Sequence, residues 1–314
     1  MKCNSCSDPA VIQMRHHKLA LCKTHYLAWL PPQVERFIQK YGMFQRGQRI
    51  LVAVSGGKDS LSLWDILWRL GYGDTTAHGG VVDGLYIGLG IDEGAAYSAE
   101  SQRLSQAFAD QRGLRLRVVD VAERYGESIP QMAGRTFRGK QKPCSVCGVS
   151  KRHIMNRSAL EGGYDVLATG HNLDDEAATL FGNTMNWQTG YLARQSPVLE
   201  ANRPGLVRKV KPLCRFYERE MAAYALLSEI EYIYEECPFA RGAKSIYYKE
   251  LLNRMEAQQP GAKMNFYLGF LQARQAGAFS SPAPDEPDRL HACETCGQPT
   301  SAPGSCAFCR MVTR

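Results

Sequence analysis

The sequence RILVAVSGGKDSLSLWDILWRL, residues 49–70, contains a strand, a glycine turn and a helix in direct succession. Residues 50–54 form a short β-branched and apolar run, which is typical of a buried strand. After the turn, Leu63, Leu67 and Leu70 recur at helical spacing, so this part predicts an amphipathic helix. Glycines let the backbone approach a ligand closely, and the first N–H groups of a helix have no intrahelical partners. The turn therefore suits an anion such as phosphate.

The turn has the sequence SGGKDS, which is neither the Walker loop nor the dinucleotide motif GxGxxG. It resembles the pyrophosphate loop of the ATP pyrophosphatases, which holds the β- and γ-phosphates while a substrate oxygen attacks the α-phosphate. The alternative is a tight Gly-Gly turn with an N-cap serine. On the resemblance, the ATP-binding residues are Ser55, Gly56, Gly57, Lys58, Asp59 and Ser60.

Length and composition indicate one main domain with small appendages, since the chain has 314 residues and 44% hydrophobic content. No apolar run approaches the ~18 residues of a membrane span, and MKCNSC is not a signal-peptide core, so we expect a cytoplasmic protein. Strands at residues 84–91 and 114–121 alternate with a helix at 95–111. This order predicts an α/β fold with a doubly wound parallel sheet, whose ligands lie beyond the carboxyl ends of the strands. We expect LVRKV, residues 206–210, to be an edge strand.

Ten of the eleven cysteines fall into three groups, which in a reducing cytosol indicates metal sites rather than disulfides. Two of the groups have the spacing of complete tetrahedral zinc sites, and the alternative is loose thiols. The N-terminal set is Cys3, Cys6, Cys22 and His25, and the C-terminal set, a zinc ribbon, is Cys293, Cys296, Cys306 and Cys309.

The third group begins with Cys144 and Cys147, on a turn that leads into a helix, and two thiolates cannot complete a metal site. The candidates for another ligand are Cys214 and Cys237. Cys237 precedes Pro238, and a Cys-Pro step recurs among iron–sulfur ligands. We therefore predict that Cys237 joins the site and that Cys214 is a small buried hydrophobic residue.

The segment YDVLATGHNLDD, residues 164–175, predicts a strand, a glycine turn at Gly170 and a helix beginning near Leu173. Asp174 and Asp175 favour the dipole of a helix N-terminus, which would explain them without any catalytic role. Because this helix begins at the same edge of the sheet as the SGGKDS turn, we expect Gly170, His171 and at least one of the two carboxylates to lie near nucleotide or magnesium.

Charge is informative through its distribution rather than its sum. The formal charge of +7 falls to about +3 if two zinc ions and one cluster occupy the thiolate sites. Residues 135–157 contain seven Lys or Arg and no acid, and residues 203–219 contain six Lys or Arg with one acid. Such stretches suit a phosphate backbone.

The order of these segments predicts four parts. They are an N-terminal zinc finger at residues 1–30, a catalytic domain at 31–279, a Pro-rich linker at 280–290 and a zinc ribbon at 291–314. We expect residues 27–44 to form a connecting helix, with Pro31 and Pro32 at its start.

Together the motifs resemble those of the tRNA 2-thiouridine synthetases over nearly the whole chain, whereas the related cytidine 2-thiolation enzymes lack the zinc modules. The matching segments are SGGKDS, PCSVCGVSKR, TGHNLDDEA, ECPF, YKELLNRME, PGAKMNFYLGF and the two zinc modules. The resemblance implies that Cys144, Cys147 and Cys237 hold a [4Fe-4S] cluster whose fourth iron has no protein ligand, and that Lys151 and Asp175 are catalytic. It also implies ATP with magnesium, two zinc ions, tRNA, a small ubiquitin-like sulfur-carrier protein with a C-terminal thiocarboxylate, and a homodimer.

The implied reaction adenylates uridine O2, releases pyrophosphate and AMP, and transfers sulfur to C2 of the T-loop uridine. Thiolation of the wobble uridine is an alternative within the same family. Two further alternatives keep zinc in the cysteine triad: an adenylating ligase that does not thiolate, and a non-catalytic RNA-binding protein.

Overall fold

The computed structural model describes residues 1–314 except 93–95, 136, 241, 280–289 and 313–314. The linker expected at residues 280–290 lies outside the described residues, apart from residue 290. No helix within the described ranges has the length and apolar character that crossing a membrane requires.

A six-stranded sheet forms the centre of the molecule, with the strand order β5-β4-β3-β6-β8-β7. All neighbouring strands pair in parallel except β7 with β8, which pair antiparallel. The α/β fold with a mostly parallel sheet is thus confirmed. One detail was wrong: β8 is not the edge strand, because β7 pairs along its outer side. The strands are β3 (Arg49–Val54), β4 (Val81–Gly88), β5 (Leu116–Asp120), β6 (Val166–Thr169), β7 (Val198–Leu199) and β8 (Arg208–Val210).

Successive residues of β3 point to opposite faces of the sheet, as the pleat requires. Ile50 and Val52 belong to one buried apolar cluster with Trp64, whereas Leu51 belongs to another with Ile154. Both faces of the sheet are therefore covered, which explains why the strand is a continuous apolar run.

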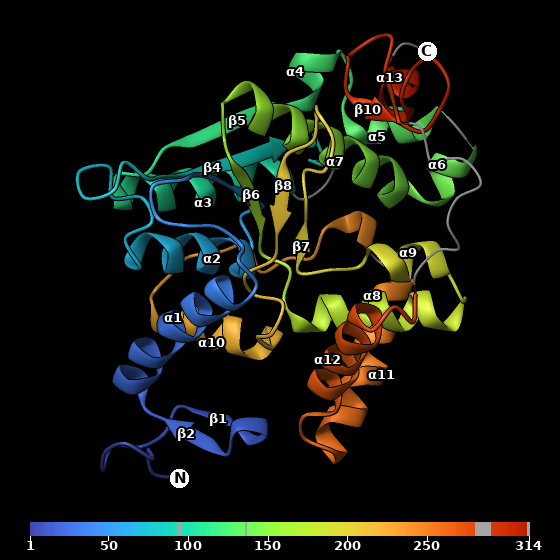
Figure 1. Ribbon diagram of the computed structural model, residues 1–314. Coiled ribbons are helices and arrows are strands. Elements are labelled where there is room, and N and C mark those ends of the chain that lie inside the picture. The colour runs from blue at the N-terminus through green and yellow to red at the C-terminus, as the bar shows by residue number, and fades with distance from the viewer. Residues whose placement is uncertain (93–95, 136, 241, 280–289, 313–314) are drawn as a thin grey trace.

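Helices cover the two faces and the carboxyl edge of the sheet (Figure 1). One face carries α1 (Lys23–Lys40), α2 (Lys58–Arg69), α3 (Tyr97–Arg112) and α10 (Glu218–Leu227). The other carries α4 (Val121–Tyr125), α5 (Ile129–Gly134), α6 (Phe137–Gln141), α7 (Pro143–Glu161) and α13 (Ala307–Val312). Beyond the carboxyl edge lie α8 (Leu173–Met185), α9 (Thr189–Arg194), the short turn η2 (Pro238–Ala240), α11 (Lys244–Gln258) and α12 (Ala262–Gln275).

The N-terminal segment is built from β1 (Ile12–Met14), η1 (Arg15–His17) and β2 (Leu19–Leu21), and it runs directly into α1. This helix begins at Lys23, so the expectation that Pro31 and Pro32 start it was wrong. Both prolines lie inside the helix, and Tyr26 and Ile38 are buried in the same apolar cluster as β3. One continuous helix therefore joins the N-terminal cysteine set to the core.

Candidate active site and metal-ligand sets

The SGGKDS turn links β3 to α2 at the carboxyl edge of the sheet. Gly56 has a φ of +73°, and a Cβ atom there would lie 2.6 Å from the backbone oxygen of Ser101. The Ser60 hydroxyl donates to the Gly57 carbonyl (3.0 Å) and accepts from the Ser55 N–H (3.1 Å). No side chain caps the N-terminus of α2, whose first residue is Lys58. This is a fixed loop with free donors and a cation, and it suits the phosphates of a nucleotide.

The turn after β6 lies against this loop. A Cβ atom at Gly170 would come within 2.9 Å of the Ser60 backbone, so the close approach requires glycine. The Asn172 side-chain amide donates to an Asp59 carboxylate oxygen over 3.0 Å, and Asn172 also caps α8 by accepting from the Asp175 N–H. The residues expected to bind nucleotide therefore share one edge of the sheet.

Three consecutive acids in the first turn of α8 each contact a lysine from a different part of the chain. Asp174 and Glu176, the first and third of these acids, have side chains that are 4% and 3% exposed. Their ion pairs join α8 to its neighbours. The middle acid is 29% exposed, and the first also accepts from the Glu218 backbone N–H over 2.8 Å. Asp175, the aspartate that the resemblance implies is catalytic, is thus the more exposed of the two. The pairs are Asp174–Lys263, Asp175–Lys249 (2.6 Å) and Glu176–Lys211 (2.7 Å).

An ion-pair network connects Asp175 to the loop. Lys249 lies 2.6 Å from Asp175 and 3.1 Å from Glu218, and Lys58 lies 2.8 Å from Glu218 and 3.1 Å from Asp59. Burial acts to raise the pKa of Glu218, but Lys249 and Lys58 outweigh it and lower the pKa to about 2. Sequence reasoning missed Glu218 and Lys249 as site residues. Lys249 lies in YKELLNRME, which matched the family without pointing to the nucleotide site.

Cys144, Cys147 and Cys237 come together at the start of α7. The Cys144 Sγ donates to the Phe239 carbonyl over 3.2 Å, so the segment after Cys237 packs against this helix. Burial raises the pKa of Cys144 and of Cys147; the nearby Cys237 thiol adds to the rise, and the charge of Lys151 opposes it. Lys151 and the three thiols thus form one group at the carboxyl edge.

The position of Cys214 differs completely. It is fully buried in the main apolar cluster, and burial raises the pKa of its thiol to about 12. Its expected role as a buried hydrophobic residue is confirmed. Cys144 is exposed, and Cys147 and Cys237 are half-buried, so an external ligand can reach this triad. Three cysteine thiols that an external ligand can reach fit the ligand chemistry of an iron–sulfur cluster.

The N-terminal set is arranged as a zinc site requires. Its four ligand atoms lie within 4.8 Å of one another. The Cys6 and Cys22 sulfurs are 3.7 Å apart, and His25 Nδ1 lies 3.2 Å from the Cys22 sulfur. A tetrahedron with Zn–S bonds of about 2.3 Å separates its sulfurs by about 3.8 Å, so these residues fit zinc.

The C-terminal set forms a second such group, close to β9 (His291–Ala292) and β10 (Pro299–Thr300). The Cys306 N–H donates to the Cys293 sulfur (3.1 Å), as is usual around a zinc thiolate. The set is docked on α7, where the Phe308 ring stacks on His153 with 4.1 Å between centroids and the Gln298 side chain accepts from Asn156. It therefore contacts the helix that carries Cys144, Cys147 and Lys151.

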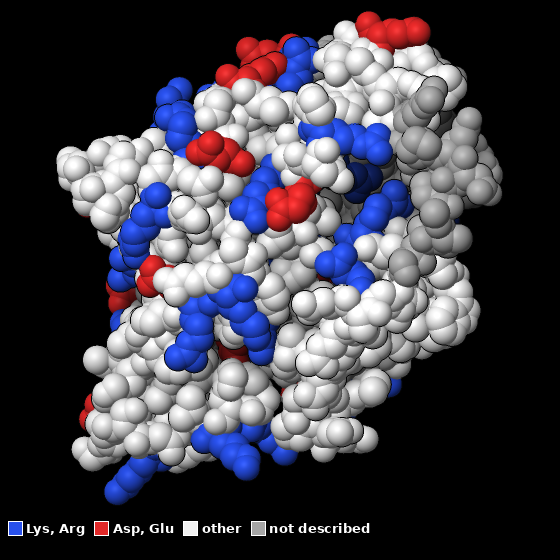
Figure 2. Space-filling model, viewed as in Figure 1, with Lys and Arg blue, Asp and Glu red and all other residues white. Residues whose placement is uncertain are grey.

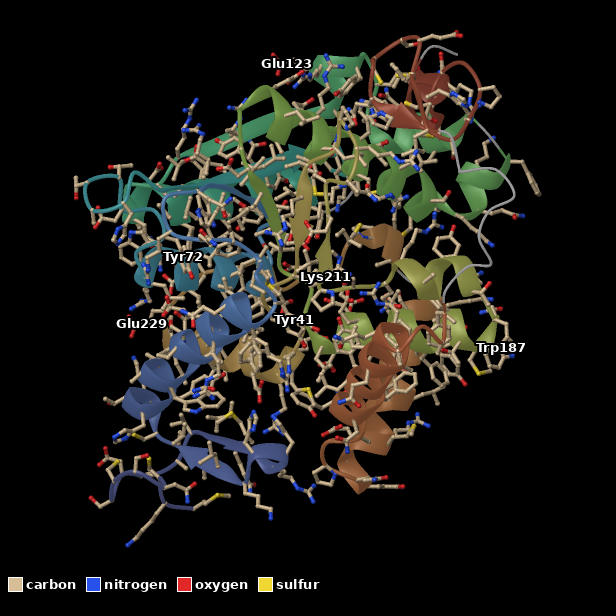
Figure 3. All side chains as sticks on the ribbon, viewed as in Figure 1. Tyr41, Tyr72, Glu123, Trp187, Lys211 and Glu229 are labelled. Atoms are coloured by element: carbon tan, nitrogen blue, oxygen red, sulfur yellow. The ribbon has the colours of Figure 1, made fainter. Side chains whose placement is uncertain are left out.

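A hollow opens between the N-terminal module and the α11–α12 pair, with Lys and Arg side chains along its margins (Figure 2). The cavity in this region has a volume of about 520 Å³, and Lys58 is one of its lining residues. Lys211 lies near the middle of the molecule, whereas Trp187 points outward at the far end of α8 (Figure 3). The cavity combines basic and acidic walls, with Arg15, Arg219, Lys263, Asp174, Glu218, Glu220 and Glu256 among its lining residues.

Two family models match the chain: a PP-loop domain over residues 30–238, and the N-terminal LIM domain of the 2-thiouridine synthetase TtuA over residues 2–27. The U34-tRNA thiolase NcsA of Methanococcus maripaludis, solved with its [4Fe-4S] cluster, shares the fold with a TM-score of 0.75 and 24% identity over 88% of each chain.

Curated relatives align over nearly the full length. The tRNA-5-methyluridine(54) 2-sulfurtransferase of Thermus thermophilus is 50% identical over 99% of this chain and 91% of its own. The enzyme of the same name from Thermotoga maritima is 42% identical over 99% of this chain and 96% of its own. The match to the PP-loop family model and the full-length similarity to these relatives agree. The chain therefore belongs to the tRNA-5-methyluridine(54) 2-sulfurtransferase family.

Proposed function

We propose that the protein is an ATP-dependent tRNA sulfurtransferase that replaces O2 of the uridine at position 54 with sulfur. The observation that carries the proposal is the meeting of three elements at one edge of the sheet: the SGGKDS loop, Asp175 and the group formed by Lys151 with three cysteines. This arrangement supports an adenylation site and a sulfur site within one structure, on a chain whose relatives bear that activity in their names.

In the first step the loop N–H groups and Lys58 would hold the β- and γ-phosphates of ATP with magnesium. Uridine O2 attacks the α-phosphorus, the bond to the β-phosphate breaks, and pyrophosphate leaves. Asp175 lies beside this loop, so we assign it to the nucleotide side, where it can orient magnesium or accept the N3 proton of the uridine. Activation is needed because a carbonyl oxygen is a poor leaving group.

In the second step a sulfur nucleophile attacks C2 and AMP leaves. Cys144, Cys147 and Cys237 would hold a [4Fe-4S] cluster, which supplies an iron without a protein ligand as a site for the sulfur. Lys151 opposes the rise in pKa of Cys144 and Cys147, so its ammonium faces the sulfur side. We assign it to stabilising negative charge there.

The remaining assignments concern metals and partners. Zinc would occupy both four-ligand sets, where it stabilises the fold and takes no part in the reaction. We further propose a small ubiquitin-like carrier with a C-terminal thiocarboxylate as the sulfur donor, and a homodimer as the working form. The exposed Cys144 leaves room for the carboxyl terminus of such a carrier.

Thiolation of defined tRNA tests the proposal. Anaerobically purified protein is incubated with ATP, magnesium, sulfide and a tRNA that carries 5-methyluridine at position 54, and thiolated RNA is detected by its retardation in an organomercury gel. We expect one thiolated nucleoside per tRNA, identified by mass spectrometry. A matched tRNA with cytidine at position 54 should remain unmodified. Thiolation at the wobble uridine instead, or ATP turnover without thiolation, would refute the assignment.

A further inference from the structure

Lys249 and Glu218 touch the proposed ATP-binding and catalytic residues but have no part in the reaction as described so far. They come from separate helices, α11 and α10, that meet beside the SGGKDS loop. Lys249 contacts Asp175 and Glu218, and Glu218 also contacts Lys58. These side chains are between 22% and 36% exposed, so they are shielded from water but reachable by a nucleotide.

Packing of α11 on α8 fixes Lys249 in place. One residue before it, the Tyr248 ring lies edge-on against Phe181, with centroids 5.3 Å apart. Three residues after it, Leu252 is buried beside Ala177. The ammonium is therefore held over the first turn of α8 by its helix and needs little further ordering to contact Asp175.

The loop lysine cannot keep its present partners when nucleotide binds. In this structure Lys58 is paired with Asp59 and Glu218, and the phosphates of ATP would compete with these carboxylates for its ammonium. Glu218 remains ionised at neutral pH, because the two lysines hold its pKa at about 2 against the effect of burial. Without a second cation, Glu218 would retain Lys58 or be left as an uncompensated, partly buried charge.

We propose that Lys249 is a positioning residue that neutralises Glu218 when Lys58 moves to the ATP phosphates, and at the same time holds Asp175 toward the nucleotide. The inference rests on the proposed function for the role of Asp175, whereas its ATP-binding part stands independently. Burial would lower the pKa of Lys249, but Asp175 and Glu218 outweigh it and raise the pKa, so the ammonium stays charged throughout.

The neighbouring lysine pairs provide a contrast within the same helix turn. Lys263 and Asp174 are each 4% exposed, and Glu176 beside Lys211 is 3% exposed. Asp174 also accepts from the Glu218 backbone N–H over 2.8 Å, but among the described residues no ion pair joins either of these pairs to Lys58 or to Asp59. They join α8 to α12 and to the segment after β8, and their removal should lower stability first. Removal of the Lys249 ammonium should instead weaken ATP binding first.

Calorimetric titration of the metal-loaded protein with α,β-methylene-ATP tests the inference. Lys249→Met should weaken binding by about tenfold, the scale of one charge-assisted contact, and Lys249→Arg should remain within about threefold of wild type. Glu218→Gln should bind as tightly as wild type or more tightly. The decisive variant is Lys249→Met/Glu218→Gln, which should recover wild-type affinity because no carboxylate then competes for Lys58. Arg254→Met, on the exposed side of α11, is the matched control and should change nothing.

Steady-state thiolation adds a second readout. The double variant should recover the KM for ATP but not kcat, because Asp175 still lacks its lysine. If Lys249 has a merely structural role, Lys249→Met should lose ATP affinity and thermal stability together, and adding Glu218→Gln should weaken ATP binding further. That pattern would overturn the inference. Wild-type ATP affinity in Lys249→Met would also overturn it. If Lys249→Met does not fold, Glu218→Gln alone decides: ATP binding weaker than that of wild type contradicts the account, and binding as tight as that of wild type or tighter supports it. Absence of thiolation in wild type would refute the proposed function and leave the titration valid.

Discussion

The two four-ligand sets and the three-cysteine site use the same chemical group in different ways. Each four-ligand set is gathered from fewer than 25 residues of chain, with ligand atoms within 4.8 Å of one another and every ligand buried or half-buried. The three-cysteine site joins Cys144 and Cys147 to a residue 90 positions later, and Cys144 is exposed. A closed set can only stabilise, whereas an open site with a missing ligand can take part in chemistry.

Removal of Cys237, the ligand that is distant in sequence, should separate the three-cysteine site from the four-ligand sets most clearly. We expect Cys237→Ser to abolish the cluster and all thiolation while zinc stays at about two per chain, because both four-ligand sets are complete without it. The measurement is iron and zinc content together with the absorption spectrum.

Cys214→Ser is the matched control for that variant. It should keep the cluster and most activity, at a cost of about 1–2 kcal/mol for placing a hydroxyl in an apolar core. Cluster loss in Cys214→Ser with retention in Cys237→Ser would reverse the assignment.

The charged side chains of Lys151 and Asp175 should affect kcat rather than the affinity for ATP and tRNA. We expect Lys151→Ala and Asp175→Ala to lower kcat by about 10²-fold or more, with nearly unchanged affinity for ATP and tRNA, because their interactions strengthen in the transition state. Lys58→Ala should show the opposite pattern and weaken ATP binding. If Lys151→Ala instead loses tRNA affinity at unchanged kcat, Lys151 belongs to the basic stretch at residues 135–157.

The C-terminal set is a closed ligand set, but its contacts with α7 should make its removal affect the rest of the molecule. A chain that ends at residue 279 loses the stacking of Phe308 on His153 and the contact of Gln298 with Asn156. We expect a melting temperature lower by about 5 °C, weaker tRNA binding and less iron per chain, because α7 carries Cys144 and Cys147. ATP binding should persist, and its loss in a folded truncated chain would contradict the boundary at residue 279.

A smaller, pH-dependent effect should appear at the same contact. Burial lowers the pKa of His153 to about 4, from an ordinary value of about 6.5. The unfolded state then binds the proton more tightly, so this stability is present above pH 6.5 and is lost as the pH falls toward 4. Between pH 7 and 5 the loss should be on the order of 2 kcal/mol. Thermal melts of His153→Gln should show a smaller pH dependence; equal slopes in both proteins would rule the effect out.

Local patterns made most of the site predictable. The SGGKDS turn, the ligand spacing around Cys3 and Cys293, and the helix start at Leu173 each depend on residues close in sequence. The resemblance chose Asp175 over Asp174, but no local pattern predicts the lysines that contact these acids, which lie about 75 to 90 residues away. The pairing of Lys58 with Glu218 and the position of β7 outside β8 are likewise long-range contacts, which no periodicity in the chain encodes.

The most direct test of the difference between the open and the closed sites is the metal content of anaerobically purified protein, measured together with its absorption spectrum. The account predicts about four irons and about two zincs per chain, with a broad band near ~400 nm. A colourless protein with about three zincs and no iron would contradict it, because the three cysteines would then form another zinc site rather than the place where sulfur is transferred.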